Sequence, residues 1–477
     1  MVTVTETTKL TRIGAVLLAA PILANLDATS VGVATEALAG SFRAPLSDVQ
    51  WVSTGYLLAL GMVMPVAGWA GDRFGAKRVW IFAVAAFTLG SMLCGLAWSL
   101  PSLIGFRLVQ AIGGGLMNPV GQAILARVAG PSRIGRLMSM LSIPVAFAPA
   151  VGPILGGVLV HELGWRWIFF VNLPVCLVVL PLAARLVPAG EGTGDRAQRL
   201  DLLGLALLSP GMAALVYGLS SAADGGSPMA VWLPVAAGVA LVVGYLVHGL
   251  RGKGVPLIDP RLFARRGFSS ATGTAFLLGA SLYSSMLLVP LYYQRATGAG
   301  VLAAGLLLAP QAVGAAFGAL VAGRWSDRSG PRRVVQLGLG LAMLGTVPFA
   351  LLGGGPFALL GSGPFALLGS GPAASVPAWL LSGALVLRGI GLGAVIGPNV
   401  AAVYTSVTRE QASRAASAVT VVNRIGGSLG TAALTVLLQA ELAASASPAA
   451  AFGHTFAWSL ALTALAFLPA ALLPRRQ

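Results

Sequence analysis

Long apolar runs, separated by short polar stretches, recur along all 477 residues of the chain. Each run holds about 18 to 25 mainly apolar residues, the length that an α-helix needs to cross the hydrocarbon core of a bilayer. The pattern predicts an all-α polytopic membrane protein with fourteen transmembrane helices, at 12–36, 49–71, 78–98, 101–127, 137–160, 167–187, 201–221, 230–250, 267–291, 302–324, 333–352, 377–401, 413–438 and 454–473.

The distribution of positive charge supports this helix count. The chain is 57% hydrophobic and 9% charged, and its net charge of +16 first suggests nucleic acid or anionic lipid as a partner. With both termini in the cytoplasm, however, 24 of the 30 Lys and Arg lie in predicted cytoplasmic loops, three lie outside and three lie within helices. Such an excess is typical of cytoplasmic loops. We therefore expect a protein of the cytoplasmic membrane that contacts lipid and no nucleic acid.

A charged turn occurs twice, 255 positions apart, each time between two long apolar runs. The first copy reads Gly-Trp-Ala-Gly-Asp-Arg-Phe-Gly-Ala-Lys-Arg over 68–78, and the second reads Gly-Arg-Trp-Ser-Asp-Arg-Ser-Gly-Pro-Arg-Arg over 323–333. Internal repetition of this kind is expected of a secondary transporter built from two related halves. The positions shared in register are Gly68, Asp72, Arg73, Gly75 and Arg78, and Gly323, Asp327, Arg328, Gly330 and Arg333.

The residue types of this turn predict its chemistry. Gly75 and Gly330 permit the positive φ that a short link between two helices needs. Asp72 and Asp327 can cap a helix or pair with a nearby arginine, and the basic residues hold the turn in the cytoplasm. We expect a latch of charge pairs that closes in one conformation and breaks in another. The alternative is a glycine turn that serves only as a topology signal.

The position of the two turns divides the fourteen helices into six, two and six. The predicted parts are an N-terminal six-helix bundle over 1–187, an inserted helix pair with cytoplasmic linkers over 188–266, and a C-terminal six-helix bundle over 267–477. An eight-residue repeat over 348–371, rich in Pro and Gly, interrupts the second bundle. Because Pro and Gly break long helices, we interpret this repeat as an extension of an outer loop.

Asp27 is the one carboxylate well inside a predicted helix. An ionisable group at that depth is costly and is by default a functional candidate. Counted from the outer helix ends, Asp27 is roughly 13 Å deep and Arg107 on the fourth helix roughly 9 Å deep, so the two side chains can meet if these helices are neighbours. We expect the pair to carry a proton, with Glu36 at the outer end of the first helix as a second candidate. The alternative is a structural ion pair that never titrates.

The fifth predicted helix carries an unusual number of helix-breaking and small residues. Pro breaks backbone hydrogen bonds and Gly lets a neighbouring helix approach, so this helix should kink and pack tightly. It either couples the conformational change to transport or is a packing helix with no coupling role. The residues concerned are Pro149, Gly152, Pro153, Gly156 and Gly157.

Polar and aromatic side chains within the predicted helices are candidates for a substrate cavity; the alternative, for about half of them, is a hydrogen bond to a neighbouring helix. The helices contain three arginines and one clear carboxylate, a balance that disfavours a strict dication exporter and permits neutral or anionic lipophilic substrates. The cavity candidates are Tyr56, Gln110, Asn118, Gln122, Tyr283, Gln311, Asn399, Asn423 and Arg424.

Motifs in several helices together resemble those of one known family. The repeated turn resembles the loop motif of the major facilitator superfamily. Three helices carry sequences that look like the motifs of its proton-coupled drug antiporters: Leu26-Asp27-x-Thr29, Arg107-x-x-Gln110 and Gly152-Pro153-x-x-Gly156-Gly157. The number of helices, fourteen, points to the fourteen-helix branch, as does the stretch Trp-Arg-Trp-Ile-Phe-Phe-Val-Asn-Leu-Pro over 165–174. The resemblance implies that Asp27 and Arg107 serve proton coupling and that the fifth helix sets the direction of exchange.

These observations predict a proton-driven exporter of lipophilic drugs, antibiotics or toxic metabolites that works by alternating access and acts as a monomer. The alternatives are a facilitator or importer of the same fold, and a non-transporting membrane sensor. An enzyme is not expected, because no nucleophile–base constellation occurs. The two cysteines and three histidines show no metal-ligand spacing, so we expect no metal and no cofactor other than the proton gradient.

Overall fold

The computed structural model describes residues 4–129, 151, 152, 154–188, 200–223, 227–252, 256–299, 303, 306–352, 377–408, 411–445 and 447–474. The regular elements of the described residues are helices, as the apolar runs predict. The helices before the predicted inserted pair are α1 Val4–Val33, α2 Thr35–Phe42, α3 Leu46–Val49, α4 Trp51–Val63, α5 Val66–Phe74, α6 Ala76–Gly95, α7 Leu100–Ala129, α9 Trp167–Phe170 and α10 Asn172–Leu186.

The remaining helices follow two linkers. The predicted inserted pair is α11 Leu202–Ala223 and α12 Pro228–Arg251, and a short 3-10 helix, η1 Pro260–Ala264, precedes the second bundle. That bundle comprises α13 Arg266–Thr297, α15 Ala309–Ser329, α16 Pro331–Ala350, α17 Ala378–Thr405, α18 Ala412–Ala444, α19 Pro448–Leu465 and α20 Phe467–Ala470.

Eleven helices within the described part of the chain are long and apolar enough to cross a membrane, or twelve if α4 and α5 form one span. These two helices meet at an angle of 52°, and Pro65 lies at the break. Proline has no backbone N–H to donate and clashes with the preceding turn, which explains the bend. The chain is thus a multi-pass membrane protein.

Two of the fourteen predicted helices have no counterpart among these spans. The predicted helix 137–160 lies largely outside the described residues, as does the repeat over 348–371 beyond Leu352. The predicted helix 302–324 overlaps α15, which is not apolar enough to count as a span because it is rich in Gly and Ala and ends in Arg324, Asp327 and Arg328. The count of fourteen therefore stays a prediction.

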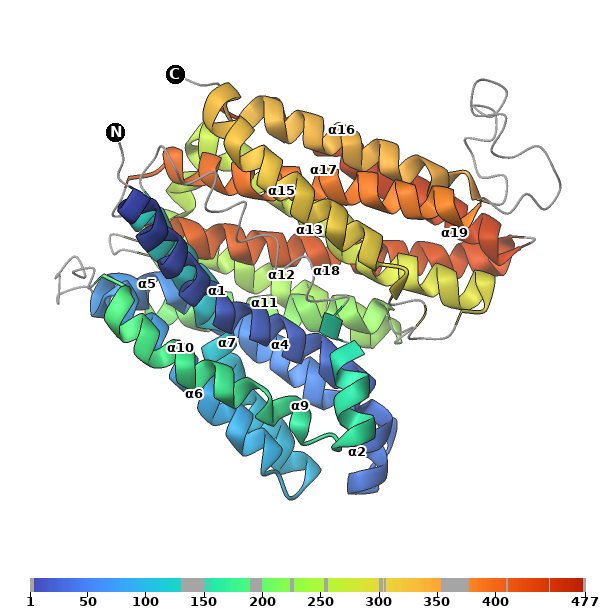
Figure 1. Ribbon diagram of the computed structural model, residues 1–477, viewed down its shortest axis with the longest axis horizontal. Helices are drawn as coiled ribbons and strands as arrows, with labels where there is room; N and C mark the ends of the chain where they lie inside the picture. Colours follow the sequence, from blue (N-terminus) through green and yellow to red (C-terminus); the bar gives the residue numbers. More distant parts are fainter. Residues whose placement is uncertain are drawn as a thin grey trace.

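The helices form two groups with the inserted pair beside them. In the first group α7 packs on α1, α4 and α6, and α10 packs on α1 and α6. In the second group α17 packs on α15 and α16, and α18 on α13 and α19. Figure 1 shows the first group in blue to green and the second in yellow to red, with the starts of α1 and α16 near the same end of the molecule as the two chain termini.

The inserted pair contacts both groups. Helix α11 packs on α12, on α4 of the first group and on α18 of the second. The Ser209 hydroxyl donates to the Met62 carbonyl at 2.6 Å, and the Trp51 and Tyr217 rings stack with centroids 6.1 Å apart. The pair is therefore docked where the two groups meet.

The two copies of the charged turn have the same backbone geometry. Gly75 joins α5 to α6 with φ +85° and ψ 131°, and Gly330 joins α15 to α16 with φ +80° and ψ 156°. These angles lie in a region that residues with a Cβ rarely adopt. The predicted positive φ is confirmed at both glycines, and the internal repeat is seen in the backbone as well as in the sequence.

Replacing either turn glycine should destabilise the protein. We expect Gly75→Ala or Gly330→Ala to cost about 1–3 kcal/mol, because alanine is strained at these angles. Thermal unfolding of the purified protein in detergent, followed by tryptophan fluorescence, measures the effect. Gly61→Ala is the matched control, since Gly61 is helical and a Cβ there would meet nothing within 4 Å. Equal melting temperatures for all three variants would contradict the role given to φ.

Candidate functional site

Asp27 and Arg107 form an ion pair inside the first group of helices. The Arg107 Nη1 donates to the Asp27 Oδ2, joining the outer half of α1 to α7. Asp27 is 2% exposed and Arg107 1% exposed, so neither charge is solvated by bulk water. The contact between Asp27 and Arg107, which their similar depth in the membrane made possible, is therefore present.

Three uncharged side chains complete this cluster. Gln110 donates from Nε2 to the Asp27 Oδ1 at 3.2 Å and to the Ser91 hydroxyl at 2.7 Å, and its Oε1 accepts from Arg107 at 2.7 Å. Asn172, at the start of α10, donates to the same Asp27 oxygen at 3.1 Å and to Ser91 at 3.3 Å. The carboxylate thus accepts from one cation and two amides, and all five side chains are buried.

Neither Asn172 nor Ser91 was predicted from the sequence. Asn172 is a polar residue inside an apolar run, a signal that would have placed it among the candidates. Ser91 gave no such signal, because serine is common in membrane helices. Its position depends on the close approach of α6 and α7: a Cβ at Gly90 would lie 2.5 Å from the Gln110 Cα.

Aromatic rings and a backbone carbonyl hold the Arg107 guanidinium in place. Its Nε donates to the Val52 carbonyl at 3.3 Å. Its central carbon lies 4.1 Å from the Tyr56 ring centroid and 5.5 Å from that of Phe169. Cations are attracted to ring faces, and more strongly where water is excluded. A charge carried on α7 is therefore packed against α4 and α9 as well as paired with α1.

The described part of the fifth predicted helix packs closely on the segment of α1 that carries Asp27. The Ser30 hydroxyl donates to the Gly152 carbonyl at 2.7 Å. A Cβ at Gly152 would lie 1.8 Å from the Thr29 hydroxyl oxygen, and one at Gly156 would lie 2.9 Å from the Ser30 carbonyl oxygen. Gly157 is less crowded, with only a Val33 methyl at 4.0 Å. Pro149 and Pro153 lie outside the described residues.

Glu36 does not join this cluster. It lies in the first turn of α2, beyond the end of α1, and its side chain is exposed. The sequence grouped Glu36 with Asp27 because it is a second acid on the first predicted helix, at its outer end. The break at Ala34 starts a separate helix and leaves Glu36 in solvent.

The first charged turn connects the two groups of helices. The Asp72 carboxylate, 3% exposed, accepts from Arg414 Nε on α18 at 3.2 Å and lies 3.5 Å from Arg127 Nη2 on α7. The structure gives Asp72 pairing with arginine rather than capping, since α6 has no side-chain cap. Gly68 permits this approach, because a Cβ there would lie 3.1 Å from the Arg414 Cα.

The other residues of the two charged turns differ in their exposure and in their neighbours. Arg73 lies within 6.0 Å of the Trp69 and Phe74 ring centroids, and Arg78 is exposed. In the second copy, Gly323 is buried in α15, while Arg328 and Arg333 are exposed. The Asp327 side chain lies outside the described residues, so its predicted role stays a prediction.

The second group also contains a buried arginine, without a carboxylate. Arg388 on α17 is fully buried, and its Nη2 contacts the Ser281 carbonyl at 3.3 Å and the Ser285 hydroxyl. Within the described part of the chain its Nε and Nη1 have no hydrogen-bond partner. The two groups of helices thus share a buried arginine, but only the first pairs it with an acid.

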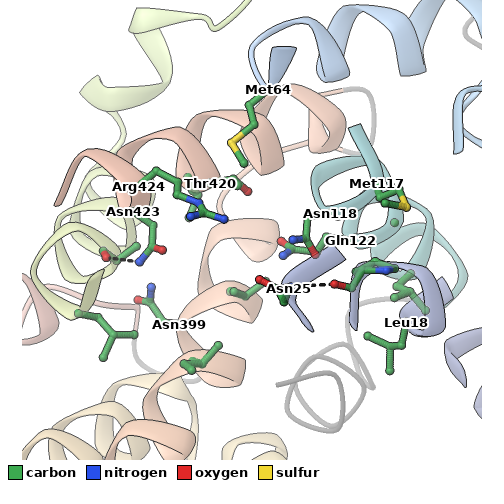
Figure 2. A pocket seen from close by; sticks show the side chains of 18 of the residues that line it. Leu18, Asn25, Met64, Met117, Asn118, Gln122, Asn399, Thr420, Asn423 and Arg424 are labelled. Atoms are coloured by element: carbon green, nitrogen blue, oxygen red, sulfur yellow. Dashed lines mark hydrogen bonds between the residues drawn. The ribbon is translucent and has the colours of Figure 1, made fainter. Parts of the chain in front are cut away.

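A cavity lies where the two groups of helices meet. It contains about 1220 Å³ of space, counting the part that opens to solvent, and it is lined from α1, α7, α13, α17 and α18, with Met64 at its edge. Figure 2 shows amide side chains from both groups around it, with Arg424 on one side. Six of the residues predicted from the sequence line this cavity: Asn118, Gln122, Tyr283, Asn399, Asn423 and Arg424. Two further polar residues that line it, Asn25 and Thr420, were not among the predicted ones.

Three of the predicted cavity residues lie elsewhere. Gln110 is drawn into the Asp27 cluster, and Tyr56 packs under Arg107. Gln311 is buried on α15 against α17, where a Cβ at Gly389 would lie 2.0 Å from the Gln311 carbonyl oxygen. Each of the three is a polar residue within a helix, which is why it was predicted to line the cavity. The sequence does not show whether the side of the helix that carries it faces the cavity or another helix.

Comparisons with known proteins agree with this geometry. The family model described as Major Facilitator Superfamily matches residues 17–431 and, in a second match, 271–476. A multidrug resistance protein B homolog of Mycobacterium tuberculosis is 39% identical over 90% of this chain and 76% of its own length. The tetracenomycin C resistance and export protein of Streptomyces glaucescens is 31% identical over 87% of this chain and 74% of its own length.

Solved structures agree on the fold. The human organic anion transporter MFSD10 aligns with a TM-score of 0.65 at 15% identity, covering 97% of this chain and 99% of its own. The proton:xylose symporter XylE aligns with a TM-score of 0.64 at 14% identity, covering 98% of this chain and 97% of its own. The family match, with relatives named for drug resistance and antibiotic export, shows a transporter and not an enzyme. The chain belongs to the Major Facilitator Superfamily.

The glycines opposite Asp27 allow a test of the packing on α1. We expect Gly152→Ala and Gly156→Ala to displace the α1 segment that carries Asp27, and to cost about 1–3 kcal/mol, because the added methyl has no space. The melting temperature and the rate of substrate efflux should both fall in these two variants. Gly157→Ala is the matched control and should behave like wild type. Loss of stability in Gly157→Ala alone would show that the packing is assigned to the wrong face.

The Asp72 contacts allow a test of the latch. Spin labels at Arg185→Cys and Arg266→Cys, both exposed, would report the distance between the two groups of helices at the end where Asp72 lies, with Cys94 and Cys176 replaced by alanine. We expect Asp72→Asn to shift the distance distribution to longer values, because one carboxylate holds both Arg127 and Arg414. The exposed Glu162→Gln is the control. An unchanged distribution in Asp72→Asn would show that the charge pairs do not hold the groups together.

Proposed function

We propose that the protein is a proton-coupled exporter of lipophilic drugs, antibiotics or toxic metabolites in the cell membrane, with both termini in the cytoplasm. The observation that carries the proposal is the buried cluster of Asp27, Arg107, Gln110 and Asn172 beside a cavity formed by both groups of helices. Relatives named for multidrug resistance and for antibiotic export add support.

In the proposed cycle, Asp27 carries the proton. A carboxylate that accepts from Arg107, Gln110 and Asn172 is stabilised as an anion. When it takes a proton, the attraction to Arg107 is lost and a buried guanidinium is left without its counter-ion, which typically costs several kcal/mol. The helices α1 and α7 then favour another arrangement. Both helices also line the cavity, so a change in their packing alters the substrate site.

The latch of charge pairs would couple that change to the membrane surface. Asp72 holds Arg127 of the first group and Arg414 of the second. Separation of these charges would open the cavity on their side, and their return would close it. The fifth predicted helix, packed on α1 at Gly152 and Gly156, would transmit the movement.

A facilitator would need the same fold without a proton carrier in the membrane, and a sensor would need no cavity open to solvent. A proton-coupled importer would share the Asp27 cluster, so the relatives named for multidrug resistance and for antibiotic export are what favour export over import. No group of three His, Cys, Asp or Glu that could hold a metal ion occurs among the described residues, and that the proton gradient is the sole cofactor stays a prediction.

Transport in everted vesicles tests proton coupling. We expect dye or drug uptake to follow the proton gradient in wild type and to fall to background in Asp27→Asn, because the amide cannot carry a proton. Glu36→Gln should retain nearly all activity, since Glu36 is exposed and outside the cluster. Equal gradient-dependent uptake in Asp27→Asn and wild type would remove Asp27 from coupling. Loss of coupling in Glu36→Gln alone would move the proton to the outer end of α1.

A further inference from the structure

The cavity differs from the Asp27 cluster in its charge. Among the described residues that line it, Arg424 is the only one that carries a charge. The Arg424 guanidinium lies 5.5 Å from the Tyr283 ring centroid, and no hydrogen bond or ion pair joins it to another part of the chain that the structure describes. Figure 2 shows its head directed into the cavity beside Asn423 and Thr420. Its N–H donors are therefore available to a bound molecule.

No carboxylate among the described residues lines this cavity. Asp27 is the one acid in the middle of a helix, and it is 2% exposed with donors from Arg107, Gln110 and Asn172. An organic cation would have to displace Arg107 to pair with it. The stretches 130–150, 301–305 and 353–376 contain no Asp or Glu, so they add no acid either. The remaining acids belong to predicted loops, turns or helix ends.

The amides of the cavity wall favour a ligand with hydroxyl groups. Asn25, Asn399 and Asn423 each donate an amide N–H to a backbone carbonyl, of Pro21, Ala271 and Ala275 respectively, at 2.7–2.9 Å. No donor among the described residues reaches their amide oxygens; the Asn399 oxygen is buried, whereas the half-buried Asn25 and Asn423 can accept from a ligand. The apolar lining, which includes Leu17, Leu278 and Val419, suits a lipophilic ring system.

We infer that this cavity selects lipophilic organic anions that carry hydroxyl groups, and that it disfavours organic cations of the same shape. The anionic group pairs with Arg424, whose planar fork of donors matches a carboxylate or phenolate. The hydroxyl groups donate to the amide oxygens of the wall. This inference rests on the proposed export function, because it names the substrate class of the same cavity.

Two dyes with one ring system allow the test. Fluorescein is an anion with phenolic oxygen and a carboxylate, whereas rhodamine 123 has the same xanthene core, an ester and a positive charge. Binding to purified protein in lipid nanodiscs, measured by fluorescence anisotropy, should favour fluorescein by about tenfold or more, as expected for one charge-assisted pair. Tighter binding of rhodamine 123 by wild type would overturn the inference.

Variants at Arg424 locate the selectivity. Arg424→Gln should weaken fluorescein binding by about tenfold or more, and should leave rhodamine 123 binding unchanged or stronger. Arg424→Lys should restore part of the affinity, since it keeps the charge without the planar fork. Arg295→Gln removes an exposed arginine and is the control for net charge. If Arg424→Gln does not fold, the comparison of wild type with Arg424→Lys still decides. Unchanged fluorescein affinity in folded Arg424→Gln would overturn the inference.

Proteoliposomes separate this inference from the export proposal. Arg424-dependent fluorescein binding without gradient-driven transport of either dye would contradict proton-coupled export and leave the selectivity of the cavity in place. Gradient-driven transport of rhodamine 123 that Arg424→Gln does not reduce, without transport of fluorescein, would support export and overturn the anion preference. Gradient-driven fluorescein transport lost in Arg424→Gln and partly kept in Arg424→Lys would support both.

Discussion

The ion pair between Asp27 and Arg107 is the constraint on which the first group of helices depends. Two opposite charges are costly to bury within a membrane protein, and the cost falls when they meet and make further hydrogen bonds. Gln110 and Asn172 supply donors to the carboxylate, and Tyr56 packs on the guanidinium. Four helices, α1, α4, α7 and α10, must therefore keep a common register. Because the packing of these helices depends on the ion pair, protonation of Asp27 would change that packing.

The two groups of helices share a backbone plan and differ in chemistry. Both have a glycine of positive φ at the charged turn and a buried arginine on the helix that packs beside it. Arg107 meets an acid, whereas Arg388 meets the hydroxyl of Ser285. The second group instead directs Arg424 toward the cavity. Under the proposed function, proton exchange belongs to the first group and recognition of substrate charge to the second, and the two are linked because α1 and α7 also line the cavity.

Much of this organisation could be predicted from residue types and spacing. The apolar runs predicted membrane helices because a bilayer demands long, uninterrupted apolar segments, and the repeated turn predicted two related halves. Asp27, Arg107 and six cavity residues were found because polar groups are costly in lipid and stand out there. Asn172, Asn25 and Ser91 were missed, and Glu36, Tyr56 and Gln311 were placed in the wrong surroundings, because being polar does not tell which neighbour a side chain meets.

The sequence by itself determined the class of protein, the membrane helices and the depth of the charged residues, since these depend on hydrophobicity and on distance along one helix. Only the tertiary structure decided which charges meet. Asp27 joins Gln110 and Asn172, 83 and 145 positions away, and Asp72 reaches Arg414 in the other half of the chain. Such contacts depend on how each helix is rotated about its axis and on how closely two helices approach at Gly68, Gly90 and Gly152. A glycine has no side chain whose chemistry would indicate, in the sequence, which helix packs against it.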